Sequence, residues 1–254
     1  MISSLSNQQI KEAAALSASA KARQESGLFV VEGRRLTEEL PEECLVKAYT
    51  TERFAESEEG TALCRRLNAE TVSEAVMAKM SDTRTPQGIL AVARQLPPAV
   101  SFPEGPLLFL ERVQDPGNVG TLFRTAEAAG AAGILMDRET ADPYNPKVVR
   151  GTMGAIFRLP FRICADAAEE LKTLRAEGYR IYAAHLAGSV PYDAPVYPER
   201  SVFLLGNEGN GLSDAVTALA DEKVRIPLCG RAESLNVAVA GAVLLYEHLR
   251  QKRN

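Results

Sequence analysis

Polar side chains able to take part in group transfer are concentrated in three short segments in the second half of this chain. The first runs from Asn118 to Arg124, the second is Gly-Asn-Glu-Gly-Asn-Gly at 206–211, and the third contains Glu-Ser-Leu-Asn at 233–236. Each follows an apolar run of strand length and leads into a helical pattern, which is where open α/β sheets bind ligands. Glycines let a backbone close around a flat ligand, and the polar groups can meet a hydroxyl or an amine. The pattern therefore indicates a ligand site made of loops.

Each segment also has a purely structural interpretation. Arg124 emerges from an apolar helical pattern, where it could equally anchor a loop carbonyl or a surface carboxylate. The segment 206–211 could be a plain turn, and either Ser234 or Asn236 could simply cap the final helix. The glycine spacing is not the dinucleotide pattern and no phosphate-loop lysine follows it. This argues against nucleoside triphosphate binding and against a nucleotide-dependent oxidoreductase.

The three segments lie in a region where apolar strands alternate with helices. Strands are predicted at 106–110, 132–136, 155–159, 180–184, 201–205 and 223–226. Helices are predicted at 118–129, 146–153, 167–176, 212–220 and 235–250, the first of them starting at an N-cap, Asn118. Such alternation is typical of an α/β fold with a mostly parallel sheet covered on both faces.

A second, shorter α/β pattern precedes it. Strands are predicted at 28–31, 45–49, 70–72 and 88–93, and helices at 8–24, 34–40, 63–67 and 73–80. Residues 96–106 then hold four prolines and a glycine, which cannot continue a helix or a central strand. We therefore expect a domain at 1–95, a semi-rigid linker at 96–106 and a second domain at 107–254.

Composition restricts the class of protein. The 254 residues are 46% hydrophobic and 24% charged, as in globular proteins, and no apolar run approaches the ~20 residues of a membrane span. The first residues lack the pattern of a secretory signal. The four cysteines and two histidines are scattered, so we expect reduced thiols and no metal site. These features predict a cytoplasmic protein without membrane association.

The net charge of −4 is a mild argument against nucleic-acid binding, although local sets of basic residues remain. These sets are Lys11, Lys21, Arg23, Arg34 and Arg35, then Lys147, Arg150, Arg158 and Arg162, and finally Arg225 and Arg231. They are either RNA-binding patches with modest salt dependence or solvated faces.

In their order and spacing, the three polar segments resemble the signature motifs of the SpoU family of RNA 2′-O-ribose methyltransferases. The resemblance extends to 145–150 and 153–155, and 29–33 is similar to a substrate-binding domain related to ribosomal protein L30e. It implies methyl transfer from S-adenosylmethionine to RNA, with 23S-type large-subunit ribosomal RNA favoured over transfer RNA. It also implies a homodimer and a SPOUT-type catalytic domain tied in a deep trefoil knot.

The resemblance assigns roles to individual positions. The residues expected to surround the target ribose are Asn118, Arg124, Glu208, Ser234 and Asn236. The residues expected to hold the cofactor are Gly206, Glu208, Gly211, Ile226, Leu228, Leu235 and Asn236.

The ribose hydroxyl is a poor nucleophile until its proton is removed, so a general base is expected. The family proposal gives this role to the arginine matching Arg124, although a free guanidinium titrates above ~12. In the alternative, Arg124 anchors an RNA phosphate and a carboxylate takes the proton, with Glu208 as the candidate. His185 is a weaker candidate.

Other functions stay open beside the leading one. The same chemistry could act on transfer RNA, or on a nucleotide whose methylation gives antibiotic resistance. A protein of another class would hold the cofactor as a non-catalytic RNA-binding assembly factor. The presence of polar residues at all five ribose-site positions argues against that loss of activity.

Overall fold

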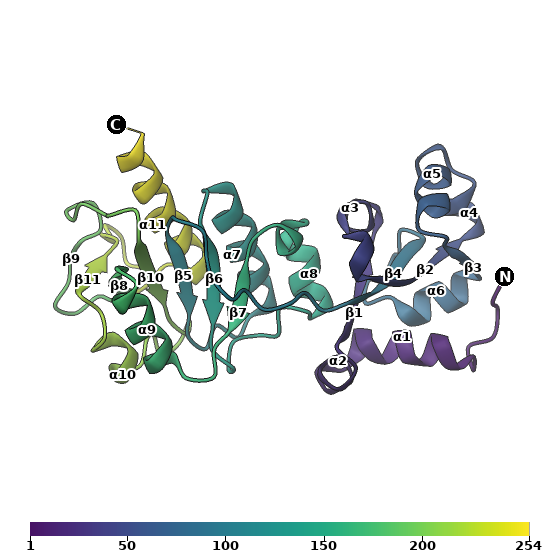
Figure 1. The fold of residues 1–254 in the computed structure, drawn as a ribbon, viewed down its shortest axis with the longest axis horizontal. Helices are drawn as coiled ribbons and strands as arrows, with labels where there is room; N and C mark the ends of the chain where they lie inside the picture. The colour runs from purple at the N-terminus through teal and green to yellow at the C-terminus, as the bar shows by residue number, and fades with distance from the viewer. Residues whose placement is uncertain (254) are drawn as a thin grey trace. The chain divides into compact units, whose positions relative to one another are not determined.

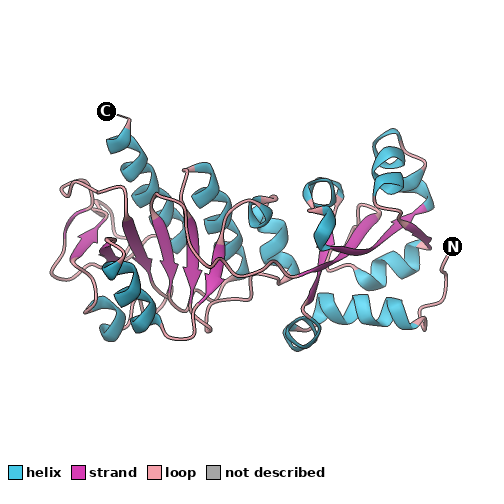
Figure 2. Cartoon of the chain, in the orientation of Figure 1, coloured by secondary structure: helices cyan, strands magenta, loops and turns pink. Residues whose placement is uncertain are grey.

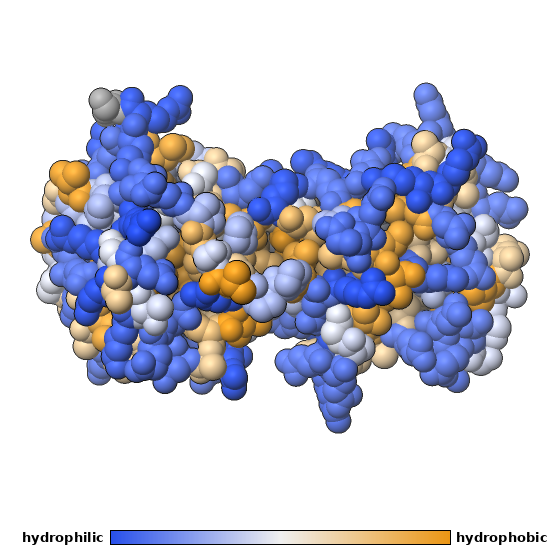
Figure 3. Space-filling view, in the orientation of Figure 1, coloured by the Kyte–Doolittle hydropathy of each residue, from blue (hydrophilic) through white to orange (hydrophobic). Residues whose placement is uncertain are grey.

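The computed structural model describes residues 1–253, which form two compact units (Figures 1 and 2). The N-terminal unit comprises Met1–Pro97 together with Asp142–Phe157. The C-terminal unit comprises Pro98–Ala141 and the residues from Arg158 onward. Hydrophilic side chains cover most of the visible surface, and hydrophobic side chains are scattered among them in small groups (Figure 3). Within residues 1–253, no helix is long and apolar enough to span a bilayer.

A four-stranded sheet in the order β1-β4-β2-β3 forms the centre of the N-terminal unit. Its strands are β1 (Leu28–Glu32), β2 (Leu45–Thr51), β3 (Glu70–Val72) and β4 (Ile89–Arg94). β4 is antiparallel to β1 and to β2, whereas β2 and β3 are parallel. The helices are α1 (Gln8–Ala18), α2 (Ala20–Ser26), α3 (Arg34–Glu39), η1 (Glu42–Cys44), α4 (Glu52–Ala55), α5 (Glu58–Arg66), α6 (Glu74–Met80) and α8 (Pro146–Thr152). One core joins Ile10 and Leu16 of α1 to Met77 and Met80 of α6 and to Leu90 of the sheet.

The single helix predicted at 8–24 is wrong, because the chain breaks at Ser19. Ser19 is extended (φ −131°, ψ 120°), and its side chain accepts a hydrogen bond from the Ala22 amide, which caps α2. Arg23 lies on α2 and is only 3% exposed, with its guanidinium donating to the Leu16 carbonyl at 2.7 Å and to Asp142 at 2.8 Å. A side chain that pins the turn in this way is not available to bind RNA.

Residues 142–157 pack within the N-terminal unit although they follow β6 in the chain. Helix α8 buries Pro146, Val148, Val149 and Thr152 and contacts β1. The Tyr144 ring lies 4.8 Å from the Phe29 ring, and its hydroxyl donates to the Leu96 carbonyl at 3.1 Å. The sequence-based domain limits place this segment in 107–254 by chain continuity, whereas its contacts group it with residues 1–97.

The C-terminal unit is built on a seven-stranded sheet in the order β7-β6-β5-β10-β8-β11-β9. Its strands are β5 (Leu107–Leu110), β6 (Gly133–Met136), β7 (Phe161–Ile163), β8 (Arg180–Ala184), β9 (Val190–Pro191), β10 (Ser201–Leu205) and β11 (Glu222–Arg225). Every strand pair is parallel, which confirms the predicted α/β sheet. All residues of β5, β6 and β10 are buried, as expected for central parallel strands covered on both faces.

Four helices cover this sheet: α7 (Pro116–Ala128), α9 (Ala167–Ala176), α10 (Asp214–Thr217) and α11 (Val237–Lys252). Leu171 and Leu174 of α9 and Val216 of α10 share a core with one face of β5, β8 and β10. Helices α7 and α11 pack together, and α11 also contacts β10. A Cβ at Gly241 would lie 2.6 Å from Leu122 of α7 and 2.9 Å from Leu205 of β10. The glycine therefore permits this close packing.

The strand predicted at 155–159 is also wrong. Met153 (φ 51°) and Gly154 (φ 91°) both adopt left-handed conformations, which end α8. The chain then forms a single 3-10 turn, η2 (Ala155–Phe157), closed by the Phe157 amide on the Gly154 carbonyl at 3.0 Å. Extended structure resumes only at β7. Local turn conformation has overridden the apolar pattern here.

Candidate active site

Three polar loops follow the carboxyl ends of β5, β10 and β11. The first leads into α7, the second into α10 and the third into α11. Since the strands are parallel, these loops lie at one edge of the sheet, the edge at which open α/β folds bind ligands.

The first loop places Asn118 differently from the prediction. Helix α7 starts at Pro116, and its N-cap is Asp115, whose side chain accepts from the Asn118 amide at 2.9 Å. Proline suits the first helical position because its missing N–H would have no partner there. The predicted N-cap role of Asn118 is therefore wrong, and its side chain is free for contacts with other loops.

The cap of the final helix, for which the sequence offered Ser234 or Asn236, is Asn236. Its Oδ1 accepts hydrogen bonds from the amides of Ala238 at 2.9 Å and Val239 at 3.3 Å, so it is the N-cap of α11. Two backbone donors fix which end of the side-chain amide is oxygen. The Nδ2 group must therefore point away from the helix.

These two asparagines connect all three loops. Nδ2 of Asn236 donates to Oδ1 of Asn118 at 2.9 Å, and Nδ2 of Asn118 donates to Oε1 of Glu208 at 2.7 Å. The orientation of each amide follows from the cap at Asn236. Oε2 of Glu208 has no hydrogen-bond partner among residues 1–253, and Glu208 is exposed. This chain of bonds ends in a carboxylate with one oxygen available to a ligand.

Arg124 and Ser234 stand apart from this hydrogen-bonded chain. Arg124 is exposed on α7, next to the buried Phe123, and forms no hydrogen bond or ion pair within the described part of the chain. Ser234 is exposed in the loop before α11, likewise without a hydrogen bond to any residue described. The structure thus links three of the five expected ribose-site residues directly. The other two are accessible to a ligand.

The loop after β10 is a closed backbone ring. The amides of Asn207 and Gly211 donate to each other's carbonyls at 3.2 and 2.8 Å. A Cβ at Gly206 would lie 2.2 Å from the Leu212 nitrogen, so only glycine fits where the ring closes. Gly211 adopts φ +67°, and a Cβ there would meet no atom within 4 Å. The ring therefore has open space on its outer side.

The loop after β11 supplies the remaining positions expected to hold a cofactor. Ile226 and Leu228 are half-buried, and Leu235 is 38% exposed. Gly230 has open space where a side chain would be. Accessible backbone together with apolar side chains suits a ligand that has a flat base and a polar tail.

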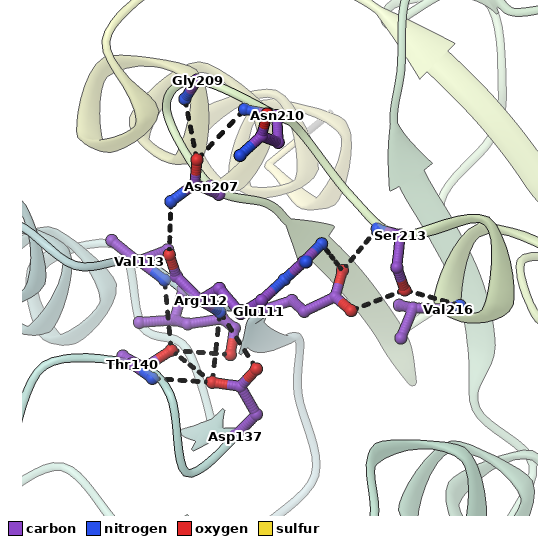
Figure 4. Close-up of polar contacts among 11 residues, drawn as sticks. Glu111, Arg112, Val113, Asp137, Thr140, Asn207, Gly209, Asn210, Ser213 and Val216 are labelled. Carbon is purple, nitrogen blue, oxygen red and sulfur yellow. Dashed lines mark hydrogen bonds and ion pairs between the residues drawn. The ribbon is translucent and has the colours of Figure 1, made fainter.

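A set of polar residues beneath the loop after β10, of which Glu111 and Thr140 are buried, was not predicted. Glu111, Arg112 and Asp137 bond to Asn207, Ser213 and Thr140, as Figure 4 shows. The available sequence signal was Glu111, an acidic residue directly after the wholly apolar strand β5. Its partner at position 213 could not be inferred, because the two residues are 102 positions apart.

His185 was the weaker candidate for the base. Its Nδ1 lies 3.0 Å from the carbonyl of Ala187, within its own loop. That contact is a local turn interaction and links it to none of the five ribose-site residues.

Comparison with known families gives two matches along the chain. Residues 106–246 match a family model described as the SpoU rRNA Methylase family. Residues 7–91 match one described as an MRM3-like substrate binding domain. The two matches together include all three polar loops and most of the four-stranded sheet of the N-terminal unit.

Named relatives align with almost the whole of this chain. A 23S rRNA (guanosine(2553)-2′-O)-methyltransferase, RlmP, of Bacillus subtilis is 36% identical over 98% of both chains. A crystal structure of an AdoMet-bound rRNA methyltransferase from Sinorhizobium meliloti aligns with a TM-score of 0.85 at 34% identity, over 98% of this chain and 97% of that one. The SpoU methyltransferase AviRb of Streptomyces viridochromogenes, in complex with AdoMet, aligns with a TM-score of 0.86 at 28% identity, over 98% of this chain and 99% of that one.

Proposed function

The chain belongs to the SpoU rRNA methylase family, and we propose that it methylates a ribose 2′-hydroxyl of 23S-type large-subunit rRNA. It is an RNA 2′-O-ribose methyltransferase that uses S-adenosylmethionine. The observation that carries the assignment of its active site is the hydrogen-bonded chain from Asn236 through Asn118 to Glu208. This chain joins the three loops at one edge of the sheet.

The residues present fit the cofactor. S-adenosylmethionine supplies an electrophilic methyl group on a sulfonium. The ring at 206–211 offers accessible backbone at Gly211, and the loop at 226–236 offers Ile226, Leu228 and Leu235 as apolar contacts. Gly206, Glu208 and Asn236 complete the proposed cofactor contacts. No metal ion enters the reaction proposed.

In the proposed mechanism, Glu208 accepts the proton of the ribose hydroxyl. Asn118 holds Oε1 of this carboxylate, so Oε2 is directed at the ligand side and needs little reorganisation. Removing the proton makes the hydroxyl oxygen nucleophilic, so that in-line transfer would form the O–C bond, break the S–C bond to the methyl group and release the neutral thioether S-adenosylhomocysteine. Ser234, exposed in the loop before α11 and without a hydrogen bond to any residue in 1–253, would donate to a ribose oxygen.

Arg124 then anchors the RNA. A guanidinium stays protonated and positively charged at neutral pH, so it suits binding a phosphate better than removing a proton. Its exposure and its freedom from any ion pair within residues 1–253 support this role. Holding the adjacent phosphate orients the 2′-hydroxyl toward the methyl group.

The N-terminal unit would hold the RNA substrate, with an L30e-like fold. Support comes from the match of residues 7–91 to a substrate-binding domain. Much of its basic surface is already neutralised, since Arg34 pairs with Glu38 at 2.7 Å and with Glu59 at 2.6 Å, and Lys21 pairs with Glu25. The cations of this unit that form no ion pair within residues 1–253 are Lys11, Arg53, Arg65, Arg66, Lys79, Arg84 and Arg94. We therefore expect RNA affinity to fall only modestly with salt.

A deep trefoil knot in the C-terminal unit is part of the proposal. One strand, β8, lies between β10 and β11 in the sheet, yet the loop after β11 returns to Asn118 near the start of α7. A chain that crosses back over its neighbours in this way is what such a knot requires. General topology rules would not predict it.

A homodimer in the cytoplasm completes the proposal. Val239 and Tyr246 on α11 are each 49% exposed, and Leu235 just before it is 38% exposed, so this helix keeps an apolar surface. Sedimentation of the full chain is expected to give a dimer. A strict monomer at micromolar concentration would contradict this part of the proposal.

The test of the function is transfer of labelled methyl from S-adenosylmethionine to total RNA from a strain that lacks the gene. Label in large-subunit rRNA supports the proposal and allows the nucleotide to be mapped. Label in transfer RNA would keep the chemistry and overturn the substrate. Cofactor binding without label in naked RNA or in ribosomal particles would favour the non-catalytic assembly factor.

A further inference from the structure

We propose that Glu111 is a positioning residue, whose buried carboxylate holds the loop 206–212 in the shape that receives the cofactor and presents Glu208. The inference rests on the proposed function, because it concerns the same site. It adds a residue that touches neither the RNA nor the cofactor and acts through Ser213.

Glu111 contacts both ends of this loop. Its backbone amide donates to the carbonyl of Leu205, the last residue of β10, at 2.9 Å. Its Oε2 accepts from the Ser213 amide at 2.7 Å, and its Oε1 accepts from the Ser213 hydroxyl at 2.6 Å (Figure 4). The side chain is only 6% exposed. One residue at the end of β5 thus fixes the points where the loop begins and ends.

Arg112 holds the same loop near its start. Its carbonyl accepts from Nδ2 of Asn207 at 2.9 Å, while Oδ1 of Asn207 accepts from the amides of Gly209 and Asn210 at 2.9 and 3.0 Å. Arg112 reaches this position in a left-handed conformation, φ 55°. Such a conformation costs about 1–2 kcal/mol for a residue with a side chain.

Asp137 offsets that cost. Both of its carboxylate oxygens lie 3.1 Å from the Arg112 amide, and Oδ1 also accepts from the amide and hydroxyl of Thr140 at 2.8 Å each. The backbone of Arg112 is therefore held from β6 on one side and holds the loop on the other (Figure 4). Glu111 and Asp137 are connected through one strained residue.

The partners of Glu111 indicate that it positions the loop and does not only stabilise the fold. A buried carboxylate is costly, and an apolar residue of similar size could fill the space beneath a loop at less cost. The three hydrogen bonds that Glu111 makes to Leu205 and Ser213 go to the residues that bound 206–212, and Glu208 lies between those bounds. The same carboxylate also lies 3.8 Å from Nη2 of Arg112, the residue whose carbonyl holds Asn207. Fixing them sets the distance over which Glu208 reaches Asn118.

Loss of the carboxylate should lower the fraction of molecules whose loop is ready to bind. Apparent affinity falls in proportion to that fraction, so a readiness of about one tenth raises the cofactor Kd about tenfold. Glu111→Gln keeps an oxygen for the Ser213 amide but cannot accept from the hydroxyl with its other end. Glu111→Asp keeps both oxygens on a shorter side chain and should recover part of the affinity.

The experiment measures S-adenosylmethionine binding by titration calorimetry on the full chain, beside the melting temperature. Glu170→Gln is the matched control, because Glu170 pairs with Arg162 on the edge strand β7 and is 16% exposed, also in the C-terminal unit. We expect E111Q to raise Kd about tenfold and E170Q to leave it unchanged at a similar loss of melting temperature. A lower melting temperature for E111Q with an unchanged Kd would overturn the inference.

A second variant covers the case in which E111Q fails to fold. Ser213→Ala keeps the backbone bond to Glu111 but removes the hydroxyl, which also caps α10 by accepting from the Val216 amide at 3.2 Å. We expect a loss of about 1 kcal/mol of stability with the fold retained. We expect a rise in Kd of about threefold, and an unchanged Kd would overturn the inference. Absence of cofactor binding by the unsubstituted chain is a different result, because it would contradict the proposed function itself.

Discussion

The loop after β10 presents two sides with opposite properties. On its exposed side, Glu208 retains a carboxylate oxygen with no partner in residues 1–253, and the exposed Arg124 of α7 likewise has no partner there. On its buried side, both carboxylate oxygens of Glu111 and of Asp137 are already bonded within the protein. Groups left free can act on a ligand, whereas groups that are satisfied can only fix geometry. Substitutions on the two sides should therefore affect different measurements.

The largest effect is expected for Arg124→Ala on the exposed side. Loss of the cation that anchors the RNA phosphate should lower kcat/KM for RNA about 10³-fold and leave cofactor affinity unchanged. The measurement is methyl transfer to rRNA at saturating S-adenosylmethionine, with Arg124→Lys as the matched variant.

Lysine keeps the charge but not the planar fork, so Arg124→Lys should recover a substantial part of the activity if Arg124 binds phosphate. Unchanged turnover in Arg124→Ala would remove the residue from the mechanism. If Arg124→Ala weakened S-adenosylmethionine binding, Arg124 would instead be a residue that supports the cofactor site.

Glu208→Gln should have the next largest effect. The amide keeps the bond to Asn118 through its oxygen but cannot accept the ribose proton, so kcat should fall about 10²-fold with little change in the KM for RNA. Pre-steady-state methyl transfer measures this step directly. A wild-type rate would show that another group or water takes the proton.

The pH dependence of stability tests a buried residue of the C-terminal unit, His248. His248 of α11 is 3% exposed, its Nε2 lies 3.0 Å from the Pro198 carbonyl, and burial lowers its pKa below the ordinary value. The His248 imidazole therefore binds a proton more readily in the unfolded chain than in the folded chain. The stability linked to His248 is complete above about pH 6.5 and is lost as the pH falls toward the folded-state pKa.

Melting of the wild type and His248→Gln at about pH 7.5 and about pH 5.5 measures this loss. Glutamine keeps a donor for Pro198 but does not titrate, and the carboxylates common to both proteins cancel in the difference. The destabilising effect of His248→Gln should be smaller at the lower pH. If the two proteins differed equally in melting temperature at both pH values, the imidazole of His248 would not titrate between those pH values.

Arg112→Gly should have the smallest effect of all. Its backbone bonds to Asn207 and Asp137 do not involve the side chain, and glycine adopts the left-handed conformation without cost. Relief of strain should offset the loss of the side chain, which is 31% exposed and whose Nη2 lies 3.8 Å from Oε2 of Glu111, so the free energy of unfolding should change by about 1 kcal/mol or less. A cofactor Kd altered more than about threefold would mean that the guanidinium itself positions the loop.

Sequence patterns located the polar loops because glycine, amide and carboxylate residues after apolar runs are local signals. They also placed most strands of both sheets. The cap at Asp115 is a local signal that was overlooked, since Asp directly precedes a proline at the first helical position. Patterns failed where a distant partner decides, as in the bond from Asn118 to Glu208, 90 positions away. The bond from Glu111 to Ser213 and the packing of 142–157 on β1 join segments far apart in the chain, and no local pattern records them.

The packing of residues 142–157 also has a consequence for how such chains can be recombined. The chain passes between the two units at 97/98, at 141/142 and again at 157/158. A single junction at the proline-rich linker would exchange residues 1–97 but leave behind Tyr144, Arg150 and the apolar side of α8, which pack on them. A functional chimera must therefore transfer two separate pieces of gene together, so the N-terminal unit is inherited as a discontinuous module.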